Sequence, residues 1–179
     1  MPQAQGTDRI LNALPIPHTA TVLMVNQEVD RPYRTALAAV VMSEPSVNAI
    51  RTGMALGLPG SAPLALVHAF LPLAKGKMFY AGLSRDSIDG YVADERVRAT
   101  NELTAFLEAN GLNDHGWSMR IEEGAPFEVI AKAVEQSKPD VLIMGTHGRS
   151  GIAKALLGSV TEEALRSLDV DILAVPPLR

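Results

Sequence analysis

The chain contains no cysteine, so disulfide bonds, thiolate metal sites and cysteine nucleophiles are excluded. No stretch reaches the ~20 consecutive apolar residues that a membrane-spanning helix needs. The N-terminus also lacks the basic start and apolar core of a signal peptide. The four histidines are scattered and do not have the spacing of metal ligands. These absences favour a cytoplasmic protein without a metal site or a membrane anchor.

Neither sign of charge dominates the sequence. Sixteen basic residues stand against twenty acidic ones, which gives a net charge of −4. This balance gives no reason to expect a nucleic-acid partner or an acidic membrane surface, so any anion site must be local. With 179 residues, of which 47% are hydrophobic, the chain is long enough to form one domain around a single core.

Short apolar runs alternate with amphipathic segments, which is the order of βαβ units and a parallel sheet. The expected strands cover residues 37–42, 64–70, 117–121, 141–144 and 172–175. The expected helices cover 43–57, 92–110, 124–138 and 159–168. This pattern predicts an α/β fold, with a doubly wound, five-stranded parallel sheet and helices on both of its faces.

The most informative segment follows the apolar run 141–144. Gly145 and Gly148 lie three positions apart, where backbone N–H groups can turn toward an anion without interference from a Cβ atom. Ser159 and Glu162 have the spacing of a capping box, which predicts a helix N-terminus and a second set of free N–H groups. Two anion sites on one edge of the sheet suggest a polyphosphate ligand.

The pattern GxxGx9GS, formed by Gly145, Gly148, Gly158 and Ser159 and followed by Val160, resembles the nucleotide-binding signature of the universal stress proteins. It is similar to that of the ATP-binding subclass in particular. The resemblance extends upstream to 40–46 and 65–69 and covers residues 36–177. It implies a Rossmann-like fold of the HUP type and ATP or a related adenine nucleotide as the ligand, accompanied or not by Mg²⁺.

The resemblance also implies which residues surround the ligand. Adenine and ribose would face Val41, Ala69 and Met144, and the triphosphate would lie over Gly145, Gly148, Gly158, Ser159 and Val160. His147 either contacts phosphate or shapes the loop. Arg149 and Lys154 either screen the phosphate charge or are ordinary solvated side chains.

This sequence departs from the family pattern at Val41, where the ATP binders usually carry an aspartate. A hydrogen bond to such a charged group is typically worth ~1.5–3 kcal/mol. The phosphate half of the site therefore looks complete and the nucleoside half weakened. We expect nucleotide binding that is looser, or less selective for adenosine, than in the family pattern.

Three functional interpretations remain open. The favoured one is a nucleotide-binding regulatory protein of the stress response, with no catalytic residue. The second is an enzyme of slow ATP hydrolysis or phosphoryl transfer, which needs a carboxylate to hold a metal ion. No aspartate or glutamate occurs between positions 141 and 159 to serve that purpose. The third is a nucleotide-free structural dimer of the same fold.

Residues 1–35 form an N-terminal extension to a universal stress protein domain at 36–179. Within the extension, 21–25 has the character of an extra strand and is expected to pair with 172–175, either within the chain or from a partner in a homodimer. The segment 71–90 is long for a connection in a βαβ unit. It is interpreted as a lid, a subunit contact or a packed loop.

Three polar residues near the expected strands have a structural interpretation. Ser43 and Ser46 stand in a helix-start context, where hydroxyl groups bond backbone N–H groups, so they are expected to act as caps. His68 lies within an apolar strand and is expected to be an interior histidine outside the site.

Overall fold

The computed structural model describes residues 20–28, 31–58, 60, 62–113, 116–146 and 157–177. The strands are β1 (Val22–Met24), β2 (Ala36–Ala39), β3 (Ala65–Phe70), β4 (Ser118–Glu123), β5 (Val141–Gly145) and β6 (Asp171–Val175). The helices are α2 (Glu44–Ala55), α3 (Lys75–Tyr80), α4 (Arg85–Ala109), α5 (Pro126–Ser137) and α6 (Ser159–Ser167). None of these helices combines the length and the apolar character needed to cross a bilayer.

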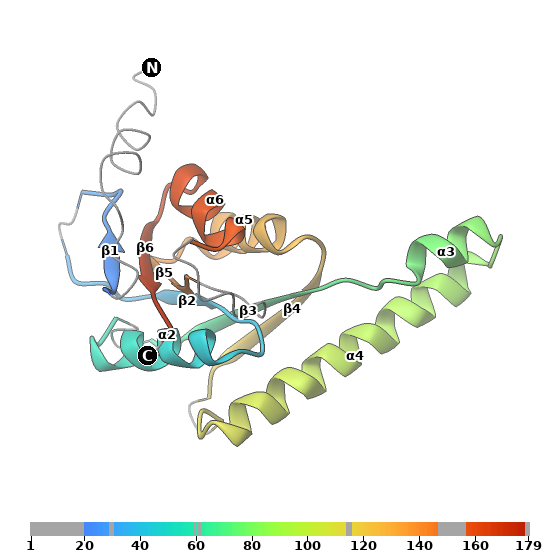
Figure 1. Ribbon diagram of the computed structural model, residues 1–179, viewed down its shortest axis with the longest axis horizontal. Coiled ribbons are helices and arrows are strands. Elements are labelled where there is room, and N and C mark those ends of the chain that lie inside the picture. Colours follow the sequence, from blue (N-terminus) through green and yellow to red (C-terminus); the bar gives the residue numbers. More distant parts are fainter. Residues whose placement is uncertain are drawn as a thin grey trace, which may run out of the picture.

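The six strands form one sheet in the order β1-β6-β5-β2-β3-β4. Strands β2 to β6 run parallel to one another, and β1 is antiparallel to β6. Helices α2 and α4 lie on one face of the sheet, and α5 and α6 lie on the other (Figure 1). This is the doubly wound α/β fold that the sequence predicts. The chain reverses its direction of winding between β2 and β5, which is where such sheets bind ligands.

Alternating strand residues build a separate core on each face of the sheet. Val141 and Ile143 pack in the cluster that includes buried residues of α2 and α4. Leu142 and Ile172 pack instead with buried residues of α5 and α6. Covered on both faces, the two central strands β2 and β5 contain no polar side chain, as is usual for buried parallel strands.

The predicted extra strand is present as β1 and pairs with β6 within the chain. Val22 is opposite Ala174, and Met24 is opposite Ile172. Because β5 occupies the other side of β6, both edges of β6 are used within one chain. The predicted homodimer through the terminal strands would therefore use the outer edge of β1.

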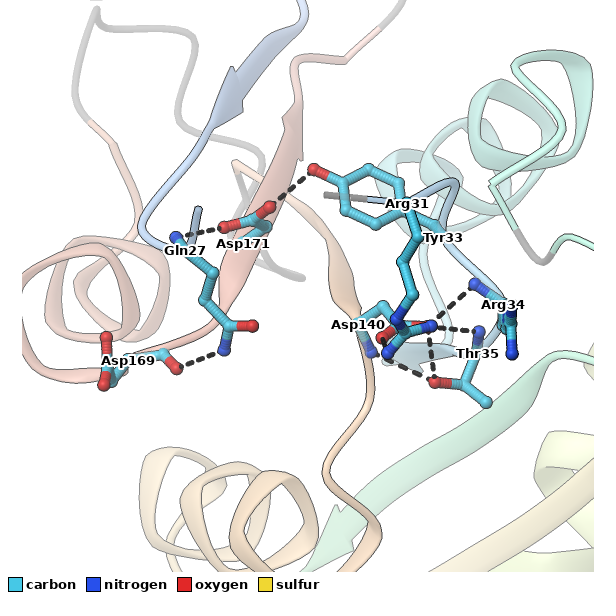
Figure 2. A network of polar contacts seen from close by, with 8 residues as sticks. All are labelled: Gln27, Arg31, Tyr33, Arg34, Thr35, Asp140, Asp169 and Asp171. Carbon is cyan, nitrogen blue, oxygen red and sulfur yellow. Dashed lines mark hydrogen bonds and ion pairs between the residues drawn. The ribbon is translucent and has the colours of Figure 1, made fainter. Parts of the chain in front are cut away.

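Two aspartates attach the extension to the sheet at the amino ends of β5 and β6 (Figure 2). Asp171, which is almost fully buried, accepts hydrogen bonds from the N–H groups of Asn26 and Gln27 at 2.7 and 3.0 Å. Its second oxygen accepts from the hydroxyl of Tyr33 at 2.6 Å. These contacts lie at the amino ends of the strands, whereas the predicted ligand site lies at their carboxyl ends.

Asp140, just before β5, holds the next part of the chain. Its carboxylate accepts hydrogen bonds from the N–H groups of Arg34 and Thr35 and forms an ion pair with Arg31 at 2.9 Å (Figure 2). Burial alone would raise the pKa of Asp140, but these N–H groups, the Thr35 hydroxyl and the Arg31 guanidinium together lower it below its ordinary value. The ionised carboxylate thereby fixes the entry into β2.

The segment 71–90 is not a packed loop, and its interpretation as a lid or a subunit contact stays a prediction. It contains α3 and the first residues of α4, and α4 begins seven positions before the predicted start at 92. Figure 1 shows α3 and the first half of α4 extending beyond the sheet. The sequence prediction missed residues 85–91 because this end of α4 packs little against the sheet, so it carries no continuous apolar stripe. Its start is marked instead by Ser84, whose hydroxyl accepts a hydrogen bond from the N–H of Ser87.

Candidate functional site

The turn between β2 and α2 forms one side of the predicted site. Strand β2 ends at Ala39 rather than at the predicted 42. Its hydrogen bonding continues for one residue, because Val40 donates to the carbonyl of Val67 at 2.9 Å. The chain then turns sharply, with the N–H of Ser43 donating to the carbonyl of Val41 at 2.7 Å. Val41 is thereby held at the carboxyl edge of the sheet.

Ser43 occupies the N-cap position of α2 but makes no capping hydrogen bond with its side chain, so the cap predicted for its hydroxyl is wrong. Ser46 does bond a backbone N–H group. Its hydroxyl accepts from the N–H of Val41 at 3.1 Å, five residues back along the chain. The reason is geometric: the tight turn brings the Val41 N–H, rather than an N–H of the first helical turn, toward this hydroxyl.

Gly145 ends β5 in close contact with the start of α2. A Cβ atom at this position would lie 3.0 Å from the carbonyl oxygen of Pro45 and 3.1 Å from its carbonyl carbon. A side chain here would require the backbone of α2 to move. Glycine at position 145 therefore allows two backbone segments to approach each other at the carboxyl edge of the sheet.

The beginning of α6 is tied to the end of β5. Gly158 donates its N–H to the carbonyl of Thr146 at 2.6 Å. The hydroxyl of Thr161 donates to the carbonyl of Gly145 at 2.9 Å. These two bonds fix the position and direction of the helix N-terminus relative to the sheet.

The predicted capping box at Ser159 is wrong. Gly158 is the N-cap of α6, no side chain caps it, and Ser159 is the first helical residue. The first hydrogen bond within the helix runs from the N–H of Glu162 to the carbonyl of Gly158 at 2.9 Å. The N–H groups of Ser159, Val160 and Thr161 precede that bond, so this helix end presents backbone donors and the positive end of the helix dipole.

A cavity of about 240 Å³ opens between these segments on the α5–α6 side of the sheet. Seven residues that the sequence predicts for the ligand site line it together: Val41, Ala69, Met144, Gly145, Gly158, Ser159 and Val160. They come from the turn after β2, from β3 and β5, and from the beginning of α6 with its N-cap, segments far apart in the chain. The predictions for His147, Gly148 and Arg149, and the alternatives for Lys154, fall outside the described residues.

The sequence prediction missed seven further residues that line the same cavity: Ala39, Val40, Ser46, Val67, Pro126, Ile130 and Thr161. Two of them were recognisable in principle. Pro126 and Ile130 lie on the first turns of a helix that follows β4, and such turns lie at the carboxyl edge of a parallel sheet. Ser46 gave no signal, since its role depends on the turn that precedes it.

The described lining contains no charged side chain. Apart from the hydroxyls of Ser46, Ser159 and Thr161, its side chains are apolar or absent. Such a cavity suits an uncharged, flat group in its interior and an anion at the uncapped end of α6. It offers no carboxylate to a metal ion, and no group of three histidines, aspartates or glutamates in the described ranges has the geometry of a metal site.

The chain matches the family model of the universal stress protein family over residues 32–176. The chain belongs to the universal stress protein family. Among curated relatives it is 26% identical to Universal stress protein E of Escherichia coli over 159 residues, which are 87% of this chain and 46% of that protein. It is 32% identical over 99 residues to Universal stress protein MJ0577 of Methanocaldococcus jannaschii, covering 53% of this chain and 60% of that one. The chain thus spans about half the length of the curated relatives that it matches.

Solved structures agree with the fold. The structure of MJ0577 superposes with a TM-score of 0.64 at 21% identity and covers 82% of this universal stress protein and 99% of its own chain. A universal stress protein in complex with cAMP is 26% identical and superposes with a TM-score of 0.51. The match covers 83% of this chain and 100% of that chain. At 21% identity, the likeness to MJ0577 concerns the fold alone.

Proposed function

We propose that this universal stress protein binds an adenine nucleotide, with ATP as the first candidate, in the 240 Å³ cavity. The observation that carries the proposal is the arrangement at one cavity of Gly145, the uncapped N-terminus of α6 and an apolar interior. The helix end would bind phosphate oxygens through backbone N–H groups, and the base would lie among the apolar side chains. A similar protein that has been crystallised with cAMP supports an adenine-containing ligand.

Mg²⁺ would enter this site with the phosphates rather than be held by the protein. The side chains of the described lining supply only hydroxyl oxygens, and the hydroxyl of Thr161 already bonds the carbonyl of Gly145. Mg²⁺ is usually bound by one or two carboxylates together with substrate phosphates. The same lack of a carboxylate in the described lining favours a binding protein over an ATPase. We therefore propose a regulatory role in the stress response, in which nucleotide occupancy alters contacts with a second copy or another partner.

A thermal-shift titration tests the proposal. ATP, ADP, AMP and cAMP would be added with and without Mg²⁺, because a ligand at ~100 times its Kd adds ~2.7 kcal/mol to the free energy of unfolding. Ala39→Leu fills the cavity from β2 and should abolish the shift. Ala65→Leu is the matched control, since Ala65 packs on the same face of the sheet but does not line the cavity.

The proposal fails if no nucleotide raises the melting temperature, or if Ala39→Leu and Ala65→Leu respond alike. Phosphate release measured on the same samples shows whether ATP is a bound ligand or a substrate. Release in step with protein concentration, lost in Ala39→Leu, would identify ATP as a substrate and favour the enzyme alternative.

A further inference from the structure

A second cavity, of about 370 Å³, lies at the carboxyl end of β3 on the α4 side of the sheet. It borders the first cavity at Val41, Ala69 and Pro126, which line both. Successive side chains of β3 point to opposite faces of the sheet, and this separates the two cavities. Val67 lines the first, whereas His68 and Phe70 line the second. Nothing in the nucleotide proposal requires this second space.

The wall formed by α4 carries a net negative charge. Glu95, Arg98 and Glu102 all line the cavity and lie on one face of the helix. Arg98 forms ion pairs with Glu95 and, at 3.9 Å, with Glu102. The side chain of Glu95 is only 13% exposed, whereas that of Glu102 is 55% exposed. Two carboxylates share one guanidinium, so one negative charge is left without a full counter-charge.

His68 adds a buried polar atom to the opposite wall. The residue is 6% exposed, and its Nδ1 lies 2.8 Å from the carbonyl oxygen of Val40. A carbonyl oxygen only accepts, so Nδ1 carries the hydrogen, and in the neutral ring Nε2 is then an acceptor.

The ring of His68 makes no other hydrogen bond within the described residues. In those same residues, no fully enclosed polar side-chain atom lacks a partner. Nε2 is therefore not enclosed by protein, and His68 is among the residues that line the cavity.

The remaining lining is apolar and includes Met42, Phe70, Leu71 and Leu73. Two carboxylate residues and an imidazole residue thus line a space with hydrophobic walls. Acceptors with a net negative charge select a donor of positive charge, and they repel a carboxylate or a phosphate. The apolar walls select a hydrocarbon body next to that donor.

We propose that this second cavity binds a primary ammonium group carried on a short apolar body. The ammonium donates hydrogen bonds to Glu95 and to Nε2 of His68, and the apolar body lies against Met42 and Leu71. The proposal is independent of nucleotide binding in the neighbouring cavity.

Phenethylamine is the probe, with two compounds of the same body as controls: 3-phenylpropionate, which carries a negative charge, and 2-phenylethanol, which carries none. Isothermal titration calorimetry measures affinity, and the imidazole C–H signals of His68 in an NMR titration report the location. We expect saturable binding of phenethylamine with movement of the His68 signals, and much weaker binding of both controls.

Glu95→Gln removes the inner charge at nearly constant volume and should weaken phenethylamine binding by about tenfold or more, as expected for a hydrogen bond to a charged group. Glu102→Gln, at a more exposed position, should have a smaller effect in the same direction. Glu108→Gln is the control, because Glu108 lies on the same helix but does not line the cavity. A thermal melt of each variant verifies its fold.

Equal binding of phenethylamine and 3-phenylpropionate would overturn the proposal, as would unchanged affinity in both Glu95→Gln and Glu102→Gln. So would the absence of saturable phenethylamine binding. Ala39→Leu distinguishes the two cavities: this variant should lose its nucleotide response and retain phenethylamine binding, because Ala39 lines the first cavity alone.

Discussion

Val41 lines both cavities and supplies no hydrogen bond from its side chain. Its backbone is nevertheless fixed, since its N–H donates to Ser46 and its carbonyl accepts from Ser43. The family pattern places an aspartate here. A carboxylate at this position would stand on a fixed backbone in the lining of the nucleotide cavity.

Val41→Asp should therefore strengthen the binding of nucleotides with free ribose hydroxyls. We expect a gain of about tenfold or more in affinity for ATP, as for other hydrogen bonds to a charged group. Calorimetric titration of ATP into Val41→Asp, into the apolar control Val41→Leu and into the unmodified protein measures it. Identical affinities in all three would contradict a ribose contact at this position.

A second prediction at this scale concerns Tyr33. Burial, the hydrogen bond to Asp171 and the negative charges of Asp171 and Asp140 raise its pKa from 10.0 to about 12. A raised pKa means that the folded state favours the neutral phenol. Its contribution to stability is complete below the unfolded pKa of 10.0 and is lost as the pH rises toward about 12.

Tyr33→Phe should be less stable than the unmodified protein at neutral pH, and the difference should shrink as the pH rises through that window. Urea unfolding from about pH 8 to about pH 12 measures it. Tyr80→Phe serves as the control, because Tyr80 is 90% exposed. A constant difference across the window would show that Tyr33 does not lose this contribution on ionisation.

At the scale of elements, α4 divides into two parts with different surroundings. Its second half packs on the sheet through Leu103 and Leu107, which are fully or almost fully buried. Its first half carries α3, in which no residue is buried. Stability should therefore be concentrated in the second half.

Leu103→Ala should lower the free energy of unfolding by about 2–5 kcal/mol, because it leaves a cavity in the core. Val97→Ala, on the same helix at a residue 59% exposed, should change it by less than about 0.5 kcal/mol. Denaturant unfolding compares the two. Similar losses in both variants would mean that the projecting part of α4 is packed against something in solution.

Most elements could be predicted from the sequence because each carries a pattern that acts over a few residues. Residues 141–144 and 172–175 read as buried strands and are strands in the structure. The start of α4 was missed because a helix that lies away from the sheet needs no apolar stripe. The cap of α6 was misassigned because Gly158 bonds to Thr146, a contact between segments that no spacing rule contains.

At the scale of the whole molecule, β1 covers an edge of the sheet that would otherwise be open. Exposed edges present unpaired N–H and C=O groups and promote association with other chains. The extension is held in place by Asp171 and Asp140, and not only by the three residue pairs of the strand.

Deletion of residues 1–30 removes β1 and should change the oligomeric state toward larger species. Sedimentation velocity compares this truncation with the full chain. Deletion of residues 1–19 is the control, since it leaves β1 in place. If the longer truncation sediments like the full chain, then β1 does not protect the edge of β6.

Part of the candidate site could be predicted from the sequence, because some of its residues act on the backbone next to them. The glycines at 145 and 158 indicate an anion site because their effect on the backbone is local. Ser46, Thr161 and the second cavity could not be predicted in this way. Their roles depend on which residues of other elements lie opposite them.

The sequence by itself determined the class of fold, the order of the six strands along the chain and the place of the glycine segment for which phosphate binding is proposed. These follow from apolar periodicity and from glycine spacing, which act over a few residues. Only the tertiary structure decided that β1 pairs with β6 of its own chain, that α4 projects beyond the sheet and that His68 lines the same cavity as Glu95 and Glu102. Each of these depends on contacts between residues far apart in the chain, and such contacts exist only once the sheet has set their register.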